Sequence, residues 1–203
     1  DWSSDVCSSD LRALSAPLAL RSGRHEEALK GADDMIAAGA PKPDALQAAL
    51  IAADALMASG RLDEAAGRLL AAGEGLDPES AAAAWGEYLR LRGTLHALQG
   101  ASADAYHDFA QSTTLLDLIG ERYQAALSQL SLGRLVAAAG ARSAAERHLN
   151  KAAAVFTQLG AERDLADLEA ARQLLGRIGT GENVMSPADA DRKSTRLNSS
   201  HVA

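Results

Sequence analysis

The side chains that could do chemistry include four histidines between residues 12 and 190, since imidazole binds metals and transfers protons near neutral pH. They are His25, His96, His107 and His148. No two of them have the spacing of a helical zinc site such as H-E-x-x-H. We expect no metal site and no catalytic histidine, with His25 and His148 as solvated helix residues.

Other catalytic motifs are missing or incomplete. The sequence contains no G-x-S-x-G elbow, and Asp33 and Asp34 have no partner carboxylate at a plausible site, so they indicate a charge pair on an outer helix face. "GTGEN" at residues 179–183 lacks the G-x-x-x-x-G-K-[ST] pattern of a phosphate-binding loop and follows a predicted helix instead of a strand. We interpret it as a linker, and we predict neither catalysis nor a cofactor.

The composition indicates an all-α protein. Aromatic residues make up only 3% of the 203 residues, so the bulk of any core comes from leucine and its close packing from alanine, the strongest helix former. No apolar run approaches the roughly 18 residues of a membrane span, because Asp54 and similar residues interrupt each candidate. "LRALSAPLALRSG" has the apolar character of a signal peptide but continues into an amphipathic helix, and we expect no membrane segment.

The two ends differ from the rest of the chain. One choice of codons for residues 1–11, which contain the single cysteine Cys7, spells a DNA that resembles a common sequencing adapter. The reverse complement of that DNA, in another frame, encodes Asp191–Ser200. We therefore predict that residues 1–11 and 191–203 are adapter-derived, and that the chain is a fragment of a longer protein.

Charge and cysteine content limit the partners of the remaining core. The end segments hold four acidic and three basic residues, which leaves 23 acidic and 17 basic residues and a net charge of −6. A negative core with few aromatics has neither the basic stripe nor the stacking platform of a nucleic-acid-binding protein. A core without cysteine fits a reducing, cytoplasmic setting, so we expect a cytoplasmic protein that does not bind nucleic acid.

An internal repeat organises residues 12–178. The hexapeptides "GRHEEA", "GRLDEA", "GASADA" and "GARSAA" begin at Gly23, Gly60, Gly100 and Gly140, which lie 37, 40 and 40 residues apart. An alanine follows each glycine by five residues, at positions 28, 65, 105 and 145. Glycine at a tight turn ends one helix and lets the next fold back, so we expect the alanine to lie at the closest approach of two helices.

Amphipathic stripes define the second helix of each unit. Steps of four and three residues put one face of the helix on the core, with the stripe Ala145, Leu149, Ala152, Phe156, Leu159 in the last unit and Ala105, Phe109, Ser112, Leu116, Ile119 in the unit before. We predict first helices at about 43–59, 79–99 and 120–139, and one further helix at 162–177.

The spacing of Leu132-Gly133, Gly140 and Ala145 resembles that of the tetratricopeptide repeat (TPR). The resemblance covers about residues 12–159 and implies an all-α, right-handed solenoid of helical hairpins, with about four repeats plus a C-terminal helix. Arg92-Gly93 and Ala52-Ala53 replace Leu-Gly in earlier units, and the 40-residue period resembles a long TPR variant. In this alignment His96 falls where TPR units place a packing aromatic. The main alternative is a HEAT-like helical repeat.

In TPR arrays the first helices line a concave groove that holds a peptide or protein partner. Carried over to this chain, the resemblance implies groove residues Asp54, Thr94 and Arg134 at one level and Leu50, Arg90 and Leu130 at the next. The alternative is that these positions form an ordinary solvated face. The Lys and Asn residues that hold a peptide carboxylate in some TPR domains are missing, so the resemblance does not extend to chaperone tails.

The stretch from Gly120 to Leu165 also resembles TPR regions of large bacterial signalling proteins, such as activators of the alternative sigma factor, nucleotide cyclases and kinase-linked regulators. In those proteins the array precedes a sensor or output domain, and residues 179–190 would begin a linker to it. The resemblance implies a non-catalytic interaction or signal-relay scaffold. The alternatives are a stand-alone TPR protein that self-assembles, and an enzyme with an unrecognised pocket.

Overall fold

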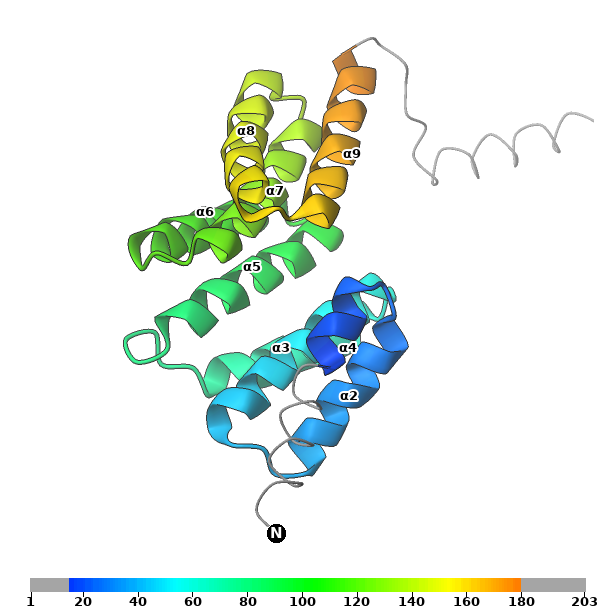
Figure 1. The fold of residues 1–203 in the computed structure, drawn as a ribbon, viewed down its shortest axis with the longest axis vertical. Coiled ribbons are helices and arrows are strands. Elements are labelled where there is room, and N and C mark those ends of the chain that lie inside the picture. Colours follow the sequence, from blue (N-terminus) through cyan, green and yellow to red (C-terminus); the bar gives the residue numbers. More distant parts are fainter. Residues whose placement is uncertain (1–14, 180–203) are drawn as a thin grey trace, which may run out of the picture.

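The computed structural model describes residues 15–179, so the predicted adapter segments 1–11 and 191–203 and nearly all of the predicted linker lie outside it. Every regular element in the described range is an α-helix, which confirms the all-α class (Figure 1). Residues 15–21 are helical. They are followed by α2 (His25–Ala37), α3 (Lys42–Ala58), α4 (Leu62–Glu74), α5 (Ala82–Leu98), α6 (Ser102–Leu118), α7 (Arg122–Ala138), α8 (Arg142–Leu159) and α9 (Glu162–Gly179).

The helices recur with a period of 20 residues. From α3 to α9 they begin at residues 42, 62, 82, 102, 122, 142 and 162. Two such steps make the 40-residue repeat, in which α3, α5 and α7 are first helices and α4, α6 and α8 are second helices. Residues 15–21 with α2 form an earlier unit, and α9 follows the last one, as the sequence predicted.

The first helices form the inner layer of the solenoid. The backbone of each lies close to the next, from α3 to α5, α7 and α9. No such backbone approach joins the described second helices, of which α2 and α4 meet through the ion pair of Asp33 and Arg68. Helices that approach each other along an array lie on the side with the shorter radius. The predicted concave side is therefore the layer of α3, α5, α7 and α9.

Glycine turns end most of these helices in the same way. At Gly140 the backbone is left-handed, with φ of 77°, and its amide donates to the carbonyl oxygen of Ala137 at 2.9 Å. The next amide, of Ala141, reaches back to the carbonyl of Val136 at 3.0 Å. This pair of hydrogen bonds satisfies carbonyls that the helix end leaves free, and it reverses the chain within three residues.

The predicted alanines at positions 28, 65, 105 and 145 are all fully buried. Still tighter contacts lie on the first helices, where Gly93 faces Phe109 and Gly133 faces Leu149. A Cβ added at Gly133 would lie 2.8 Å from a methyl carbon of Leu149, closer than real Cβ contacts. Helices α5 and α7 therefore each pack against their second helix through a residue that has no side chain.

Two details depart from the sequence prediction. Ile119 and Leu159, placed at the ends of the buried stripes, are 40% and 51% exposed, because the helices end there. Helix α5 begins three residues later than predicted, since Asp77 holds residues 77–81 in a turn. Its carboxylate accepts hydrogen bonds from the hydroxyl of Ser80 at 2.7 Å and the amide of Glu79 at 3.1 Å.

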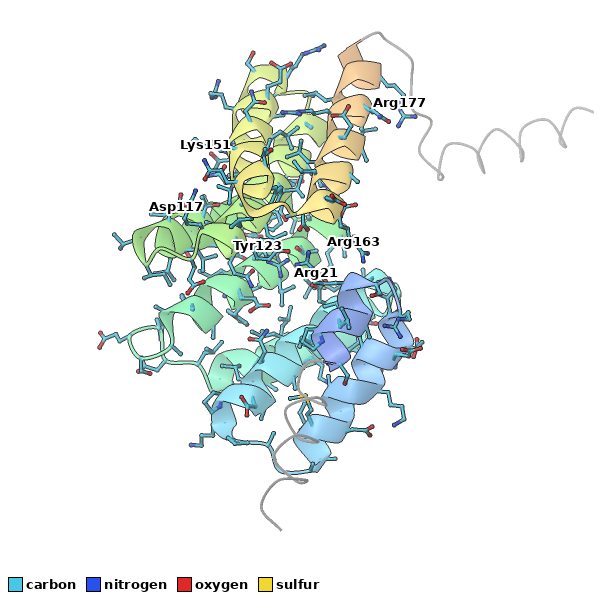
Figure 2. The ribbon with its side chains drawn as sticks, viewed as in Figure 1. Arg21, Asp117, Tyr123, Lys151, Arg163 and Arg177 are labelled. Carbon is cyan, nitrogen blue, oxygen red and sulfur yellow. The ribbon has the colours of Figure 1, made fainter. Side chains whose placement is uncertain are left out.

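The two ends of the array meet at a polar cluster of Arg21, Tyr123 and Asp164, called here the end cluster. Arg21, at the end of helix 15–21, donates a hydrogen bond to Tyr123 at the start of α7, and Figure 2 labels both residues. Arg21 also donates a hydrogen bond to Asp164 at the start of α9, at 3.0 Å. The Tyr123 hydroxyl lies 3.1 Å from the same carboxylate, and the guanidinium lies over the tyrosine ring. The described part of the array is therefore bent far enough for helix 15–21 to touch α7 and α9.

Candidate interaction surface

The six predicted groove residues separate into two levels. Leu50 and Leu130 are 0% and 3% exposed, so they belong to the core and have no surface to offer a partner, which corrects their assignment to the groove. Arg90, the equivalent residue between them in the repeat, keeps only 13% of its side chain exposed. Asp54, Thr94 and Arg134, four residues further along each helix, are half-buried or exposed.

The physical reason is the rotation of the helix. Residues four apart are offset by about 40° around the axis, because 3.6 residues complete one turn. That rotation turns positions 50, 90 and 130 away from the inner surface and into the contacts between helices. The leucine at two of these three positions is the feature of the sequence that could have indicated burial.

Asp54 and Arg90 form an ion pair between two inner helices. The Arg90 guanidinium lies 3.8 Å from the carboxylate of Asp54 on α3 and 3.9 Å from that of Glu87 on its own helix. The pair therefore occupies this part of the inner layer, and its charges compensate one another.

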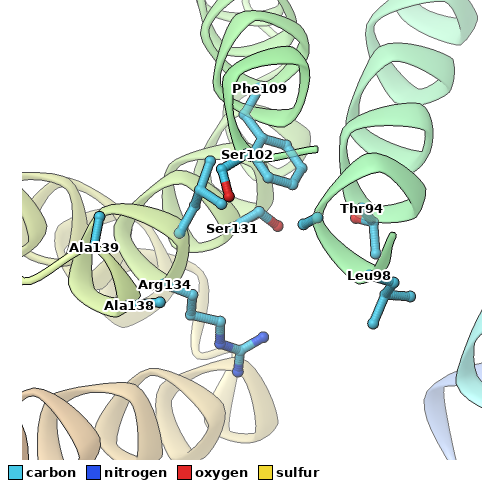
Figure 3. A pocket seen from close by; sticks show the side chains of 10 residues that line it. Thr94, Leu98, Ser102, Phe109, Ser131, Arg134, Ala138 and Ala139 are labelled. Carbon is cyan, nitrogen blue, oxygen red and sulfur yellow. The ribbon is translucent and has the colours of Figure 1, made fainter. Parts of the chain in front are cut away.

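A hollow of about 440 Å³ opens between the C-terminal halves of α5 and α7 (Figure 3). Thr94 and Arg134, two of the predicted groove residues, line it. The other lining residues are apolar or carry a hydroxyl, namely Ala97, Leu98, Ser102, Phe109, Ser131, Leu135, Ala138 and Ala139. The volume lies within the roughly 300–1,000 Å³ typical of ligand sites.

The polar groups of this hollow differ in what they already bind. The Thr94 hydroxyl donates to the carbonyl oxygen of Arg90 at 3.0 Å, within its own helix. Arg134 donates one hydrogen bond, at 3.0 Å, to the carbonyl oxygen of Asp167 on α9. A guanidinium carries five N–H donors, so most of its capacity stays available at the edge of the hollow.

A second polar cluster, which the sequence analysis missed, links α5 to α6. Asp108 is 2% exposed and accepts two hydrogen bonds from Arg92, at 2.5 and 2.9 Å. These hydrogen bonds raise the pKa of Arg92 above its ordinary value. The Nδ1 atom of His96 lies 3.0 Å from the same carboxylate but is not aligned for a hydrogen bond. The cluster is an internal ion pair that joins two helices.

Two of the three remaining histidines, His25 and His148, are more enclosed than expected, whereas His107 is exposed. His148, predicted to be solvated, is half-buried, and its Nδ1 lies 2.7 Å from the amide oxygen of Gln129. Burial of the ring and the nearby cations Lys151 and Arg147 lower its pKa. The Nδ1 of His25 is buried without a hydrogen-bond partner. Both residues are therefore half-buried instead of fully solvated.

Among residues 15–179, no group of three or more His, Cys, Asp or Glu side chains is arranged to hold a metal ion. Over the same range, no helix combines the length and the apolar character that crossing a bilayer requires. Neither finding identifies a ligand. The hollow between α5 and α7 is the described hollow that two predicted groove residues, Thr94 and Arg134, line.

No family model matches the chain, and no curated protein matches it.

Proposed function

We propose that the chain is a non-catalytic protein-interaction scaffold, a TPR-like array that binds a peptide or protein partner on the inner layer of α3, α5, α7 and α9. The observation that supports this proposal is the hollow between α5 and α7, which combines apolar walls with hydroxyls and one guanidinium. Surfaces of this mixed kind, built on rigid helices, suit the recognition of a side chain from another protein.

The location of the hollow also favours a binding role. Its lining comes from the first helices α5 and α7 and from the second helix α6 between them, so a ligand there contacts consecutive repeat units together. An array that binds in this way can transmit a change in curvature from one unit to the next. From the resemblance of residues 120–165 to TPR regions of bacterial signalling proteins, we propose further that the scaffold relays signals in the cytoplasm within a larger bacterial regulator, where further domains follow the array.

Selection from a phage-displayed peptide library tests the binding role. We expect the purified chain to select peptides that bind the inner layer. Ser131→Trp, which fills the hollow with an indole ring, should weaken their binding at least about tenfold, equivalent to about 1.4 kcal/mol. The matched control is Ser143→Trp on α8, where the side chain is exposed on an outer helix.

Peptides that bind Ser131→Trp as tightly as the original chain would place any binding site elsewhere. Failure to select any peptide would count against a peptide-binding scaffold. The regulator proposal has its own test, the sequence of the gene beyond codon 190. We expect it to encode a sensor, ATPase or cyclase domain, and a stop codon shortly after that point would contradict the proposal.

A further inference from the structure

The hollow between α5 and α7 has one charged lining residue, Arg134. No carboxylate of the described residues forms an ion pair with this guanidinium, which is hydrogen-bonded only to a neutral carbonyl. Two other arginines of the inner helices differ in this respect. Arg21 pairs with Asp164 at 3.0 Å, and Arg90 lies 3.8 Å from Asp54. Arg134 thus carries a positive charge that the described part of the chain does not compensate.

The rest of the hollow is uncharged and mostly apolar. Leu98, which is 53% exposed, and Ala138 stand on opposite walls, on α5 and α7 (Figure 3). Figure 3 also shows the hydroxyls of Ser102 and Ser131 directed into the space between these helices. An occupant must therefore place apolar surface between the helices and an anionic group at the edge.

From this complementarity we propose that the hollow binds a peptide segment in which an acidic residue follows an aliphatic one, with its carboxylate paired to Arg134. The inference rests on the proposed scaffold function and specifies the class of its partner. A guanidinium binds a carboxylate through two parallel hydrogen bonds, which a neutral amide cannot match. The aliphatic side chain lies against Leu98, Leu135 and Ala138 in the same hollow.

Three fluorescein-labelled nonapeptides test the inference by fluorescence anisotropy, with the sequences GSGLELGSG, GSGLQLGSG and GSGLKLGSG. The glutamate peptide should bind at least about tenfold more tightly than the glutamine peptide, as expected for one charge-assisted hydrogen-bonded pair. The lysine peptide should bind more weakly than either. Raising the salt concentration should reduce the preference for glutamate.

Arg134→Gln should abolish the preference between the glutamate and glutamine peptides. The matched control is Arg142→Gln on α8, whose side chain is 57% exposed, and it should leave the preference unchanged. Because Arg134 also binds the carbonyl of Asp167, a second measurement uses the unmodified chain. The Nε–Hε resonance of Arg134 should shift on addition of the glutamate peptide and not of the glutamine peptide.

Equal binding of all three peptides, or a preference that survives Arg134→Gln, would overturn this inference and leave the scaffold proposal standing. Failure of all three peptides to bind at concentrations up to about 1 mM would overturn it too, since a dissociation constant of that size corresponds to only about 4 kcal/mol of binding free energy. Binding of free hexanoate, a small aliphatic carboxylate, is measured as an additional test. Binding of hexanoate without binding of the glutamate peptide would assign the hollow to a small carboxylate and reject a peptide partner.

Discussion

The buried carboxylate of Asp108 is tolerated in this core because of a single partner, Arg92. A buried carboxylate is costly unless it is paired and hydrogen-bonded. Arg92 meets both needs with two hydrogen bonds and stays one-third exposed, which lets its own charge keep partial contact with water. The Arg92 guanidinium also lies 5.3 Å from the centre of the Tyr88 ring, so the pair extends to a third side chain.

We expect Asp108→Asn to lower the free energy of unfolding by about 2 kcal/mol, the size of a hydrogen-bonded contact to a charged group. The amide keeps the shape of the carboxylate but loses its charge and one acceptor for Arg92. Asp117→Asn on the same helix is the control, because Asp117 is exposed, and it should change stability by less than about 0.5 kcal/mol. Urea unfolding of both variants measures the difference, and equal effects would show that the buried pair is not stabilising.

The lowered pKa of His148 predicts a dependence of stability on pH. In the unfolded chain the imidazole has its ordinary pKa near 6.5, so below about that pH the unfolded state binds more protons than the folded state. Acidification from pH 7.5 to 5.5 should therefore decrease the free energy of unfolding. His148→Gln cannot take up this proton and should reduce the decrease. Urea unfolding at the two pH values compares them, and the same decrease in both proteins would contradict the prediction.

At the scale of the helices, much of the fold could be predicted because one turn recurs. Glycine at positions 60, 100 and 140 marks the helix ends, and the structure has a left-handed backbone at each. The inter-unit turn after α4 could not be predicted in this way, since Ser80 occupies the equivalent position and the side chain of Asp77 organises that loop instead. The residues of the inner face were predicted only in part, because the repeat pattern gives the position of each helix along the chain but not its rotation about its own axis.

Two helix-interior glycines should respond to alanine with opposite signs. Gly133→Ala brings a methyl group against Leu149 and should destabilise the protein by about 1–3 kcal/mol, as overpacking does. Gly67→Ala in α4 meets no neighbour within 4 Å and should stabilise it by about 0.5–1 kcal/mol, since alanine favours the helix. Thermal or urea unfolding gives both values. Stabilisation by Gly133→Ala would show that the two helices of that unit are less tightly packed than described.

At the scale of the whole molecule, the end cluster is the feature that no local pattern indicated. Arg21 and Asp164 are 143 residues apart in the sequence, and their meeting depends on the curvature that all the intervening units accumulate. A small change of angle at each turn would separate them. Repeat spacing predicts which helices are neighbours but not this sum, so the contact could be found only in the structure.

A double-mutant cycle measures the strength of that contact. Arg21→Gln and Asp164→Asn should show a coupling free energy of about 0.5–1.5 kcal/mol, toward the low end of direct contacts because half of the Arg21 side chain is exposed. The coupling should shrink at high salt concentration. Additive effects of the two substitutions at low salt would show that the ends do not interact in solution.

The end cluster also affects how the chain folds and unfolds. In an open array each unit touches only its neighbours, so either end can fray while the rest persists. A contact across 143 residues raises the contact order, closes a long loop late in folding, and makes the opening of one end weaken the other. Native-state hydrogen exchange detects this: Arg21→Gln should speed amide exchange in the first turns of α9, more than 140 positions away in the sequence, while the amides of α5 between them keep their protection.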